Sequence, residues 1–542
     1  MKRIIGIVKR ISFIRLFLVL VIVVAILAGS SWWVSSEVSQ SRSGSGETWF
    51  APYIDATLPP FLHFEDPIEQ PALDVVLGFI VADPRDPCLP SWGTYYDLDA
   101  AARALDMDRR IVRLVERGGS AIVSFGGAVN DELATACTDL DDLVNAYQSV
   151  IDRYDLKVLD FDIEGGAIAD VEANERRAIA MRRLQEANPG LQIWLTVPVA
   201  PFGMTAEGVA LVDLTLDARV ELAGVNVMTM DYGGSRTPEM SMREATLQAL
   251  NNTWQQLDGA YQRQGTSLTQ QEIWSLMGAT PMIGQNDVPA EVFTLADAEW
   301  LSQFAAQNGL GRLSFWSANR DAQCGPDIVE GRVSNTCSGV QQEPLEFSLA
   351  LATGAPSNRS PALAAAEIEP TQAIEGHTEG RAGEASRDDP TTSPYPIWRA
   401  AKVYEEGDKV VWQNRVYQAK WWTQSDQPDA PVRNVWDTPW RYLGPVLEID
   451  REIARARVAD AKQRPNWNSE SVYLAGDEVE YEDQVFRAKW WTQANVPQED
   501  PDQPYDHPWE YIGDVAAPTP TPTTPASPPP TTPTPTAEPP GS

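Results

Sequence analysis

The sequence predicts an α/β protein: a (β/α)8 barrel of the TIM type followed by two small all-β modules. Three observations predict this fold class. Short apolar runs alternate with stretches of helical periodicity from residue 49 to about residue 350, which is the pattern of repeated β-α units. A Trp-rich segment then occurs twice at a constant spacing. Segments rich in Pro, Thr, Ala and Ser separate these regions and end the chain.

The amino terminus has the composition of an export signal. Basic residues precede an apolar stretch, and residues 16–36 carry no charge, which is long enough to span a bilayer if the segment is retained. Residues 1–36 are therefore predicted to be a signal peptide, with cleavage after Ser30 as one option, or a signal anchor with Trp32 and Trp33 at the membrane interface. In either case we expect the remainder to be secreted (extracellular) or anchored at the cell surface.

Eight apolar runs are expected to form the barrel strands. They are 49–55, 75–81, 121–127, 158–164, 192–199, 224–231, 273–279 and 312–317, with helical segments such as 101–117 between them. An open doubly wound sheet is the alternative fold. It is disfavoured because no Gly-x-Gly-x-x-Gly segment follows the first run, and because polar residues occur at the carboxyl ends of many different runs.

The fourth run contains three carboxylates in an apolar context. Asp160, Asp162 and Glu164 alternate with Phe161 and Ile163, so in a strand the acids share one face. Like charges that close repel, and at least one acid should stay protonated near neutral pH. Such an acid beside ionised neighbours is what glycoside hydrolysis requires. A solvated strand edge or a calcium loop is the alternative, but neither usually alternates acids with large apolar residues.

Two copies of a Trp-rich segment occur after the barrel, and the two copies align with each other without a gap. Trp421-Trp422 recurs as Trp490-Trp491, an offset of 69 residues. Domains this small have little core, so some tryptophans must form it while others face outward. On a strand, adjacent tryptophans would point to opposite faces, which leaves one of each pair away from the core and suited to stacking on a sugar ring.

Composition sets the remaining boundaries. The predicted regions are the barrel over 45–350, a linker over 351–394, the first module over 395–446, a spacer over 447–463, the second module over 464–515 and a Pro/Thr-rich tail over 516–542.

Charge and cysteine content limit the partners. Forty-two basic and 76 acidic residues give a net charge of −34, which argues against nucleic acid or anionic lipid and favours a neutral polymer. Four cysteines in an exported chain allow three disulfide pairings, of which we favour Cys324 with Cys337 and Cys88 with Cys137. With no Cys-x-x-Cys pair and three distant histidines, we expect no metal and no cofactor. A monomer is expected.

The barrel resembles family 18 of the glycoside hydrolases, the chitinase family, on three features in chain order. The family signature DxxDxDxE is matched over 157–164, SxGG is matched by Ser124-Phe125-Gly126-Gly127, and the tryptophan that closes the eighth strand is Trp316. The resemblance implies a TIM barrel and a retaining mechanism assisted by the substrate.

Two departures from the family pattern occur. Lys157 replaces the first Asp of the signature, but its parity points it away from the acids, so its effect should be on structural support. On the sixth strand the family's MxYD reads Met228-Thr229-Met230-Asp231, followed by Tyr232. The lost tyrosine normally contacts the acetamido group of the substrate, and Tyr232 or Tyr53 is expected to replace it.

The resemblance also implies a role for each acid. Glu164 would protonate the glycosidic oxygen and then activate water, Asp162 would orient the acetamido group, and Asp160 would tune the ionisation of Asp162. Trp316 would form the floor under the sugar at the cleavage point. The expected substrate-binding residues are Asp231, Tyr232, Met228, Trp316, Tyr53, Ser124 and Gly126.

The repeats resemble family 5/12 chitin-binding modules, whose AKWWT core stands at 419–423 and 488–492. The resemblance implies binding through Trp421, Trp422, Trp490 and Trp491, supported by Tyr404 and Tyr473. The expected function is a chitinase acting on chitin and chitooligosaccharides. One alternative is an endo-β-N-acetylglucosaminidase acting on other GlcNAc glycans such as N-glycans, or a hydrolase directed at peptidoglycan. The other is a non-catalytic chitin-binding protein.

Overall fold

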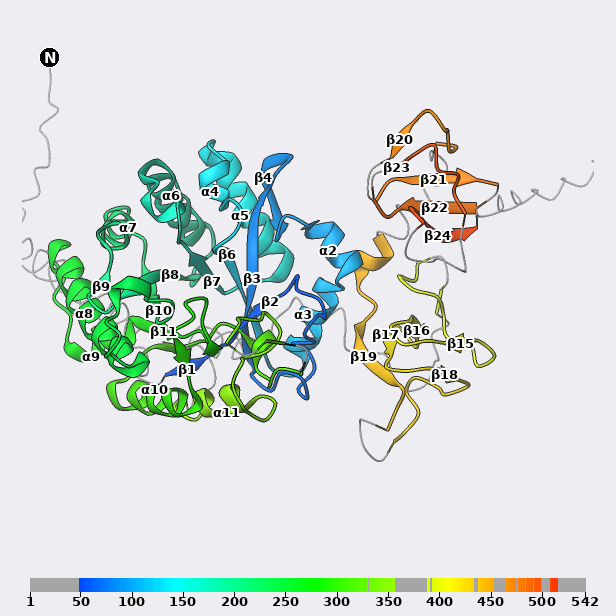
Figure 1. Cartoon of the computed structure of the whole chain (residues 1–542). Helices are drawn as coiled ribbons and strands as arrows, with labels where there is room; N and C mark the ends of the chain where they lie inside the picture. The colour runs from blue at the N-terminus through cyan, green and yellow to red at the C-terminus, as the bar shows by residue number, and fades with distance from the viewer. Residues whose placement is uncertain are drawn as a thin grey trace, which may run out of the picture. The chain divides into compact units, whose positions relative to one another are not determined.

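A computed structural model describes residues 48–326, 328–329, 331–355, 388–389, 392–432, 437–452, 465–473, 476–482, 484–490, 492–498 and 507–514 (Figure 1). The chain divides into two compact units. One contains the barrel region together with Arg399–Pro445, and the other contains Arg387–Trp398 and the residues from Val446 onward. The predicted signal segment and tail lie outside the described residues, and so does the predicted linker apart from residues 351–355, 388–389 and 392–394. Helix α11 (Glu346–Ala352) runs into this range, so the first residues of the predicted linker belong to the barrel region.

Parallel strands form the barrel sheet, and each strand is paired in parallel with its neighbour in the ring. They are β1 (Trp49–Phe50) with β2 (Tyr53–Asp55), β3 (Asp74–Asp83), β6 (Ser120–Gly126), β7 (Val158–Asp162), β8 (Gln192–Ala200), β10 (Leu222–Met228), β11 (Met277–Thr280) and β14 (Arg312–Leu313). The first strand is split: β1 pairs with β14, whereas β2 pairs with β3. This segment therefore connects the last strand to the second, and the predicted (β/α)8 architecture is confirmed.

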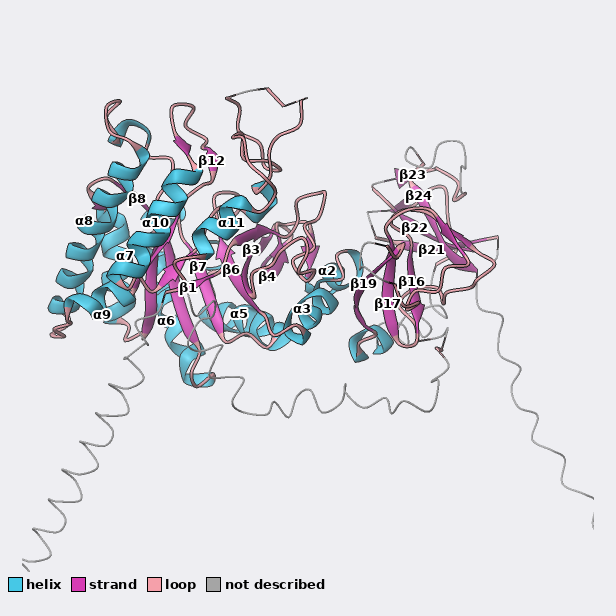
Figure 2. Ribbon diagram, turned by 90° about the horizontal axis from the view of Figure 1, so that it is seen from below, coloured by secondary structure: helices cyan, strands magenta, loops and turns pink. Residues whose placement is uncertain are grey.

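Helices surround this sheet (Figure 2). They are α2 (Leu98–Ala104), α3 (Met107–Glu116), α4 (Leu133–Ala136), α5 (Leu140–Tyr154), α6 (Val171–Ala187), α7 (Ala206–Asp217), α8 (Met242–Arg263), α9 (Gln270–Ser275), α10 (Leu295–Asn308) and α11 (Glu346–Ala352). Local chemistry fixes where several begin. The Asp139 carboxylate accepts from the first turn of α5, and Ser241 with Glu244 forms a capping box on α8.

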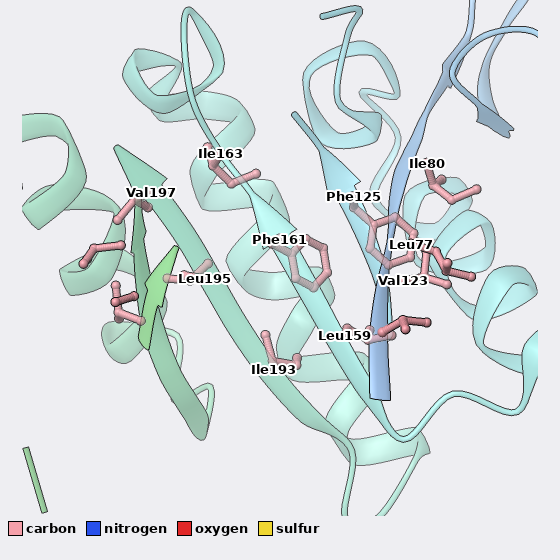
Figure 3. Close-up of a cluster of buried hydrophobic side chains, with 14 of the residues drawn as sticks. Leu77, Ile80, Val123, Phe125, Leu159, Phe161, Ile163, Ile193, Leu195 and Val197 are labelled. Atoms are coloured by element: carbon pink, nitrogen blue, oxygen red, sulfur yellow. The ribbon is translucent and has the colours of Figure 1, made fainter. Parts of the chain in front are cut away.

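Strand alternation separates an outer core from the barrel interior. Figure 3 shows Leu159, Phe161 and Ile163 of the β7 segment beside Phe125 and Leu195 of the neighbouring strands, in the layer that the helices cover. The Phe161 ring stacks on Phe125 at 5.2 Å. Each large side chain buried there contributes about 1.5–3 kcal/mol, so a one-residue slip of β7 would be costly. This outer packing forces Asp160 and Asp162 into the barrel.

Additional elements extend some strands. β4 (Asp86–Trp92) and β5 (Tyr96–Asp97) continue antiparallel from β3, and β12 (Gly284–Gln285) pairs with β13 (Val292–Phe293) after β11. The disulfide Cys88–Cys137 joins β4 to the end of α4, and Cys324–Cys337 closes a loop after β14. Both favoured pairings are confirmed.

Several predicted boundaries are wrong. Residues 270–275 form helix α9 and not the start of a strand, because Thr269 and Glu272 make a capping box that begins a helix there. The predicted helix over 101–117 is broken at Asp106, whose φ is 52°. The runs over 158–164, 224–231 and 312–317 leave the strand ladder early, at Asp162, Met228 and Leu313. Their last residues therefore belong to loops at the carboxyl ends of the strands.

Both Trp-rich modules are all-β, as predicted, with matching strands. The first has β15 (Val403–Tyr404), β16 (Lys409–Trp412), β17 (Arg415–Ala419), β18 (Thr423–Gln424) and β19 (Trp440–Pro445); the second has β20 (Val472–Tyr473), β21 (Glu478–Tyr481), β22 (Gln484–Ala488), β23 (Thr492–Gln493) and β24 (Trp509–Asp514). In each, a two-stranded and a three-stranded antiparallel sheet enclose a small aromatic core.

Within the described part of the chain, no helix has the length and apolar character needed to cross a membrane.

Candidate active site

The three acids lie along one path at the carboxyl end of β7. Asp160 is fully buried, Asp162 is 5 % exposed and Glu164 is half-buried. The ladder ends at Asp162, yet the Ile163 N–H still donates to Thr196 O (2.9 Å). The extended path therefore continues past the strand, and Glu164 keeps the parity of the two aspartates. Burial of the side chains increases along the row from Glu164 inward to Asp160.

Two glycines allow β6 to approach this path. Gly126 has φ 106°, and a Cβ there would overlap the carbonyl oxygen of Asp162. Gly127 has φ 88°, its N–H donates to the same carbonyl (3.0 Å), and a Cβ would press on the ring of Phe79. The SxGG segment is thus needed for close backbone packing beside Asp162. Gly126 thus packs against the backbone of Asp162, and its predicted contact with substrate stays a prediction.

Asp160 is held by donors from four strands. Its Oδ2 accepts from Tyr53 Oη and Ser124 Oγ, both at 2.7 Å. Its Oδ1 accepts from Thr196 Oγ1 at 2.7 Å and from Arg312 Nη1 at 2.6 Å. Tyr53 and Ser124 therefore act on the carboxylate, and the structure does not present either hydroxyl to solvent.

Asp162 is the least satisfied member of the row. Its buried Oδ1 has no hydrogen-bond partner among the residues that the structure describes. Burial raises the pKa of Asp162 well above its ordinary value, the charges of Glu164 and Asp160 raise it further, and Arg312 lowers it. An unpaired oxygen inside the barrel is costly unless a ligand donates to it.

Glu164 stands where two loops bring further acids. Burial, followed by the negative charges of Asp231 and Asp287, raises the pKa of Glu164 to about 7. Asp231 follows β10 with φ 47°, and its Oδ1 accepts from Val288 N (3.1 Å). The pKa of Asp231 is also raised, chiefly by burial. Asp162 and Glu164 thus both have raised pKa values, and the expectation of a protonated acid near neutral pH agrees with this electrostatic environment.

An aromatic group lies beside the acids. The half-buried ring of Trp316 stacks on Phe79 at 5.5 Å and lies 6.3 Å from the Tyr53 ring. Because Trp316 follows β14 and Phe79 lies on β3, the pair bridges two strands that flank the split first strand. This surface suits the apolar face of a sugar.

The sixth-strand residues occupy different environments. Tyr232 is 5 % exposed, and its hydroxyl meets Thr246 Oγ1 of α8 (3.1 Å), in the core outside the barrel. This placement disfavours a contact between its hydroxyl and the substrate. Met228 is 8 % exposed, whereas Met230 is half-buried. The predicted roles of Tyr232 and Met228 at the substrate stay predictions.

Lys157 is separate from the acids, as its parity indicates. Its ammonium pairs with Asp155 (2.6 Å), and the two side chains are 44 % and 65 % exposed. The replaced signature position therefore lies in a surface ion pair.

Sequence reasoning missed several residues of this site. Thr196 and Arg312 bind Asp160, and Asn226 joins Thr196 to Thr280 by hydrogen bonds of 3.1 and 2.7 Å. All lie on apolar strands at inward parity. The signal that could have found them was a polar or charged side chain inside a run whose other face is buried. Phe79 and Asp287 were missed too, and nothing in their local sequence marks them.

The module aromatics divide into exposed and core rings. Trp421 is 42 % exposed, Trp422 60 % and Trp490 42 %, whereas Trp491 lies outside the described residues. Trp421 and Trp422 lie between strands, so the expectation that one of them turns into the core is wrong for this pair. Tyr404 and Tyr473 are 1 % and 6 % exposed, and their hydroxyls accept from Arg399 N and Asn468 N. This burial disfavours their predicted contact with sugar.

Comparison with known proteins finds relatives for both the barrel and the Trp-rich modules. The family model for "Carbohydrate-binding module family 5/12" matches residues 397–441 and 466–510. The "Probable bifunctional chitinase/lysozyme" of Escherichia coli (strain K12) is 37 % identical over 290 residues, which is 52 % of this chain and 31 % of that protein. "Endochitinase 11" of Metarhizium anisopliae is 36 % identical over 284 residues, 50 % of this chain and 52 % of that protein. The chain thus spans about a third to a half of these curated relatives.

A solved structure covers the barrel more completely. Active domain 2 of a chitinase from Pyrococcus furiosus, solved with catalytic-site mutations, is 31 % identical. The match covers 57 % of this chain and 95 % of that domain, with a TM-score of 0.50. The shared barrel, the acid row on β7 and the two matched modules lead to one conclusion: the chain belongs to family 18 of the glycoside hydrolases, the chitinase family, and carries two family 5/12 carbohydrate-binding modules.

Proposed function

We propose that this protein hydrolyses the β-1,4 bonds of chitin and chitooligosaccharides. The observation that carries the proposal is the pair at the end of β7: Glu164, with a pKa of about 7, beside the buried and unpaired Oδ1 of Asp162. A proton donor is most efficient when its pKa lies near the working pH. An unpaired buried acceptor suits an amide N–H, which the acetamido group of N-acetylglucosamine supplies.

The first step breaks the glycosidic bond. Glu164 gives its proton to the glycosidic oxygen as the bond from that oxygen to the anomeric carbon breaks. The acetamido carbonyl oxygen attacks the anomeric carbon from the other face and forms a cyclic oxazolinium ion. Asp162 accepts a hydrogen bond from the acetamido N–H, which aims the carbonyl and stabilises the positive charge.

The second step restores the enzyme. Water attacks the anomeric carbon, and the Glu164 carboxylate takes the proton that the water loses. The oxazolinium ring opens and returns the acetamido group. Two inversions at one carbon give net retention. Trp316 and Phe79 would support the apolar face of the sugar while these steps occur.

The anomeric form of the product tests this mechanism. Proton NMR of early products from chitooligosaccharides should show the β anomer before mutarotation. An initial α anomer would exclude the substrate-assisted route, and no product from chitin or its oligosaccharides would refute chitin as the substrate, leaving the other GlcNAc glycans and the non-catalytic alternative.

Peptidoglycan is a second candidate substrate. The one observation in its favour is the name of the Escherichia coli relative, which includes lysozyme activity. The same acids would serve its N-acetylated sugars. Release of muropeptides at a rate comparable to that of chitooligosaccharides would support this substrate, and turnover of chitin alone would exclude it.

The modules would retain the protein on insoluble chitin. Exposed Trp421, Trp422 and Trp490 support this role. Two weak sites on one chain raise retention through effective concentration when both can engage.

We also propose that the protein works outside the cytoplasm, secreted or anchored at the cell surface by its amino-terminal segment. The two disulfides support this location because they persist in oxidising compartments. Cell fractionation with immunodetection tests it, and accumulation of reduced protein in the cytoplasm would contradict it.

A further inference from the structure

A guanidinium group lies inside the barrel beneath the acids. Arg312, on β14, is fully buried, and its Nε donates to Ser314 Oγ (2.8 Å). Its charged end lies 5.3 Å from the ring centres of Trp49 and Tyr53 and 5.6 Å from that of Trp194. Barrel interiors are usually filled by branched apolar side chains. A buried ion pair is also seldom more stabilising than apolar packing of the same volume. Packing alone therefore does not explain this arginine.

The partner of Arg312 is a carboxylate with no acceptor site to spare. Arg312 and Thr196 donate to one oxygen of Asp160, while Tyr53 and Ser124 donate to the other. A carboxylate offers about four acceptor positions, so four donors occupy it fully. Asp160 then has no oxygen available to share a proton with Asp162. The donors come from β2, β6, β8 and β14, which the barrel register holds in place.

We propose that Arg312 is a positioning residue that fixes the Asp160 carboxylate and offsets its negative charge, so that the working proton is divided between Asp162 and Glu164 alone. This inference rests on the proposed function and goes beyond it, because Arg312 touches neither the substrate nor the reacting atoms.

The charged and titratable groups around Asp162 and Glu164 determine in which direction the loss of Arg312 would shift the pH dependence of activity. Asp160 and Tyr53 face Asp162 from β7 and β2, Asp231 and Asp287 face Glu164 from two loops, and Arg320 lies near those two loop acids. Arg312 is the cation that lowers the pKa of Asp162. Removing Arg312 would leave the negative charge of Asp160 unopposed. The proton shared by Asp162 and Glu164 would then be released only at a higher pH. The acidic limb of the pH profile would then move to higher pH.

The test measures kcat/KM on soluble chitooligosaccharides from pH 4 to 9. Arg312→Met should lower activity at pH 5 at least about tenfold more than at pH 7, because an opposite charge at close range shifts a neighbouring acid by a unit or more. Arg312→Lys, which keeps the charge, should restore most of the acidic limb. Arg110→Met is the matched control: Arg110 is also buried and pairs with Glu65 (2.9 Å), but on α3 away from the acids. It should lower thermal stability without moving the limb.

A double variant keeps the proposal testable if Arg312→Met folds poorly. Asp160→Asn should move the acidic limb to lower pH, because it removes a negative neighbour and leaves Arg312 unopposed. Asp160→Asn with Arg312→Met removes both charges and should return the limb close to that of the parent. Loss of activity by the same factor at every pH, or shifts of the two single variants in the same direction, would overturn the role of Arg312. An inactive parent protein would instead refute the proposed function.

Discussion

The barrel and the modules differ in the kind of side chain that they would present to the same proposed polymer. The barrel buries its acids, and Asp160 alone takes donors from four strands. The modules expose rings, with Trp422 60 % exposed, and keep their buried aromatics for a small core. Raising the pKa of a carboxyl group requires desolvation and fixed neighbours, which the interior of the barrel supplies at Asp162. Stacking on a sugar requires only a rigid exposed ring. The comparison indicates that chemistry and adsorption should be separable by mutation.

The largest expected effect tests the barrel side of this comparison. Glu164→Gln removes the proton donor while keeping the shape, so kcat on chitooligosaccharides should fall by about 10²–10⁴. Adsorption to chitin beads should be unchanged because the module rings are untouched. A variant that releases oligosaccharides at near the parental rate would refute the assignment of the acid.

The next effect tests the module side. Replacing Trp421, Trp422 and Trp490 with Ala should weaken retention on chitin beads by roughly tenfold or more, since each stacked ring is worth about 1 kcal/mol. Turnover of soluble oligosaccharides should be preserved. Val403→Ala and Val472→Ala are the matched controls, because these valines are exposed on the same modules but cannot stack. Equal retention of the tryptophan and valine variants would contradict the binding role. Deleting residues 394–514 should give the same separation of adsorption from turnover.

A smaller effect concerns the basic limb of the pH profile. Because Glu164 must be protonated to act, activity should decline as the pH rises through about 7, the pKa of that group. Asp287 raises this pKa, so Asp287→Asn should move the basic limb to lower pH. Asp287 is exposed, and the difference between parent and variant should shrink at high salt. A limb that moves upward in the variant would contradict this electrostatic account.

The smallest effect is expected at Lys157. Its ion pair with Asp155 is exposed on both sides, and such pairs contribute under about 1 kcal/mol. Lys157→Ala should change kcat/KM less than about twofold, and thermal unfolding should shift little. A large loss of activity would contradict this expectation and show that the residue at position 157 affects the catalytic acids.

Local pattern was enough to predict some of this structure. The alternation of Asp160, Asp162 and Glu164 with Phe161 and Ile163 specified a shared face because strand parity is a property of neighbouring residues. The two modules could be recognised because the same Trp-rich segment recurs at a constant offset of 69 residues, a comparison that needs no knowledge of the fold. The pairing of Cys324 with Cys337 followed from their short separation.

Other features depend on contacts that no local pattern contains. Arg312 meets Asp160 across 152 residues of sequence, and only the closed ring brings them together. Tyr232 was expected at the substrate because it follows Asp231, and that role stays a prediction. The local sequence does not indicate that its hydroxyl lies 3.1 Å from the Thr246 hydroxyl on α8. Tyr404 was expected to support sugar binding, but its ring packs against Trp440 in the small core of the module.

The unpaired oxygen of Asp162 has a consequence for engineering. A buried acceptor without a partner destabilises the folded state, so the site is maintained at the expense of stability. Asp162→Ala should therefore raise the melting temperature while eliminating turnover. A screen that selects variants of this protein only for heat resistance would enrich inactive enzymes, and any such screen needs an activity readout at every round.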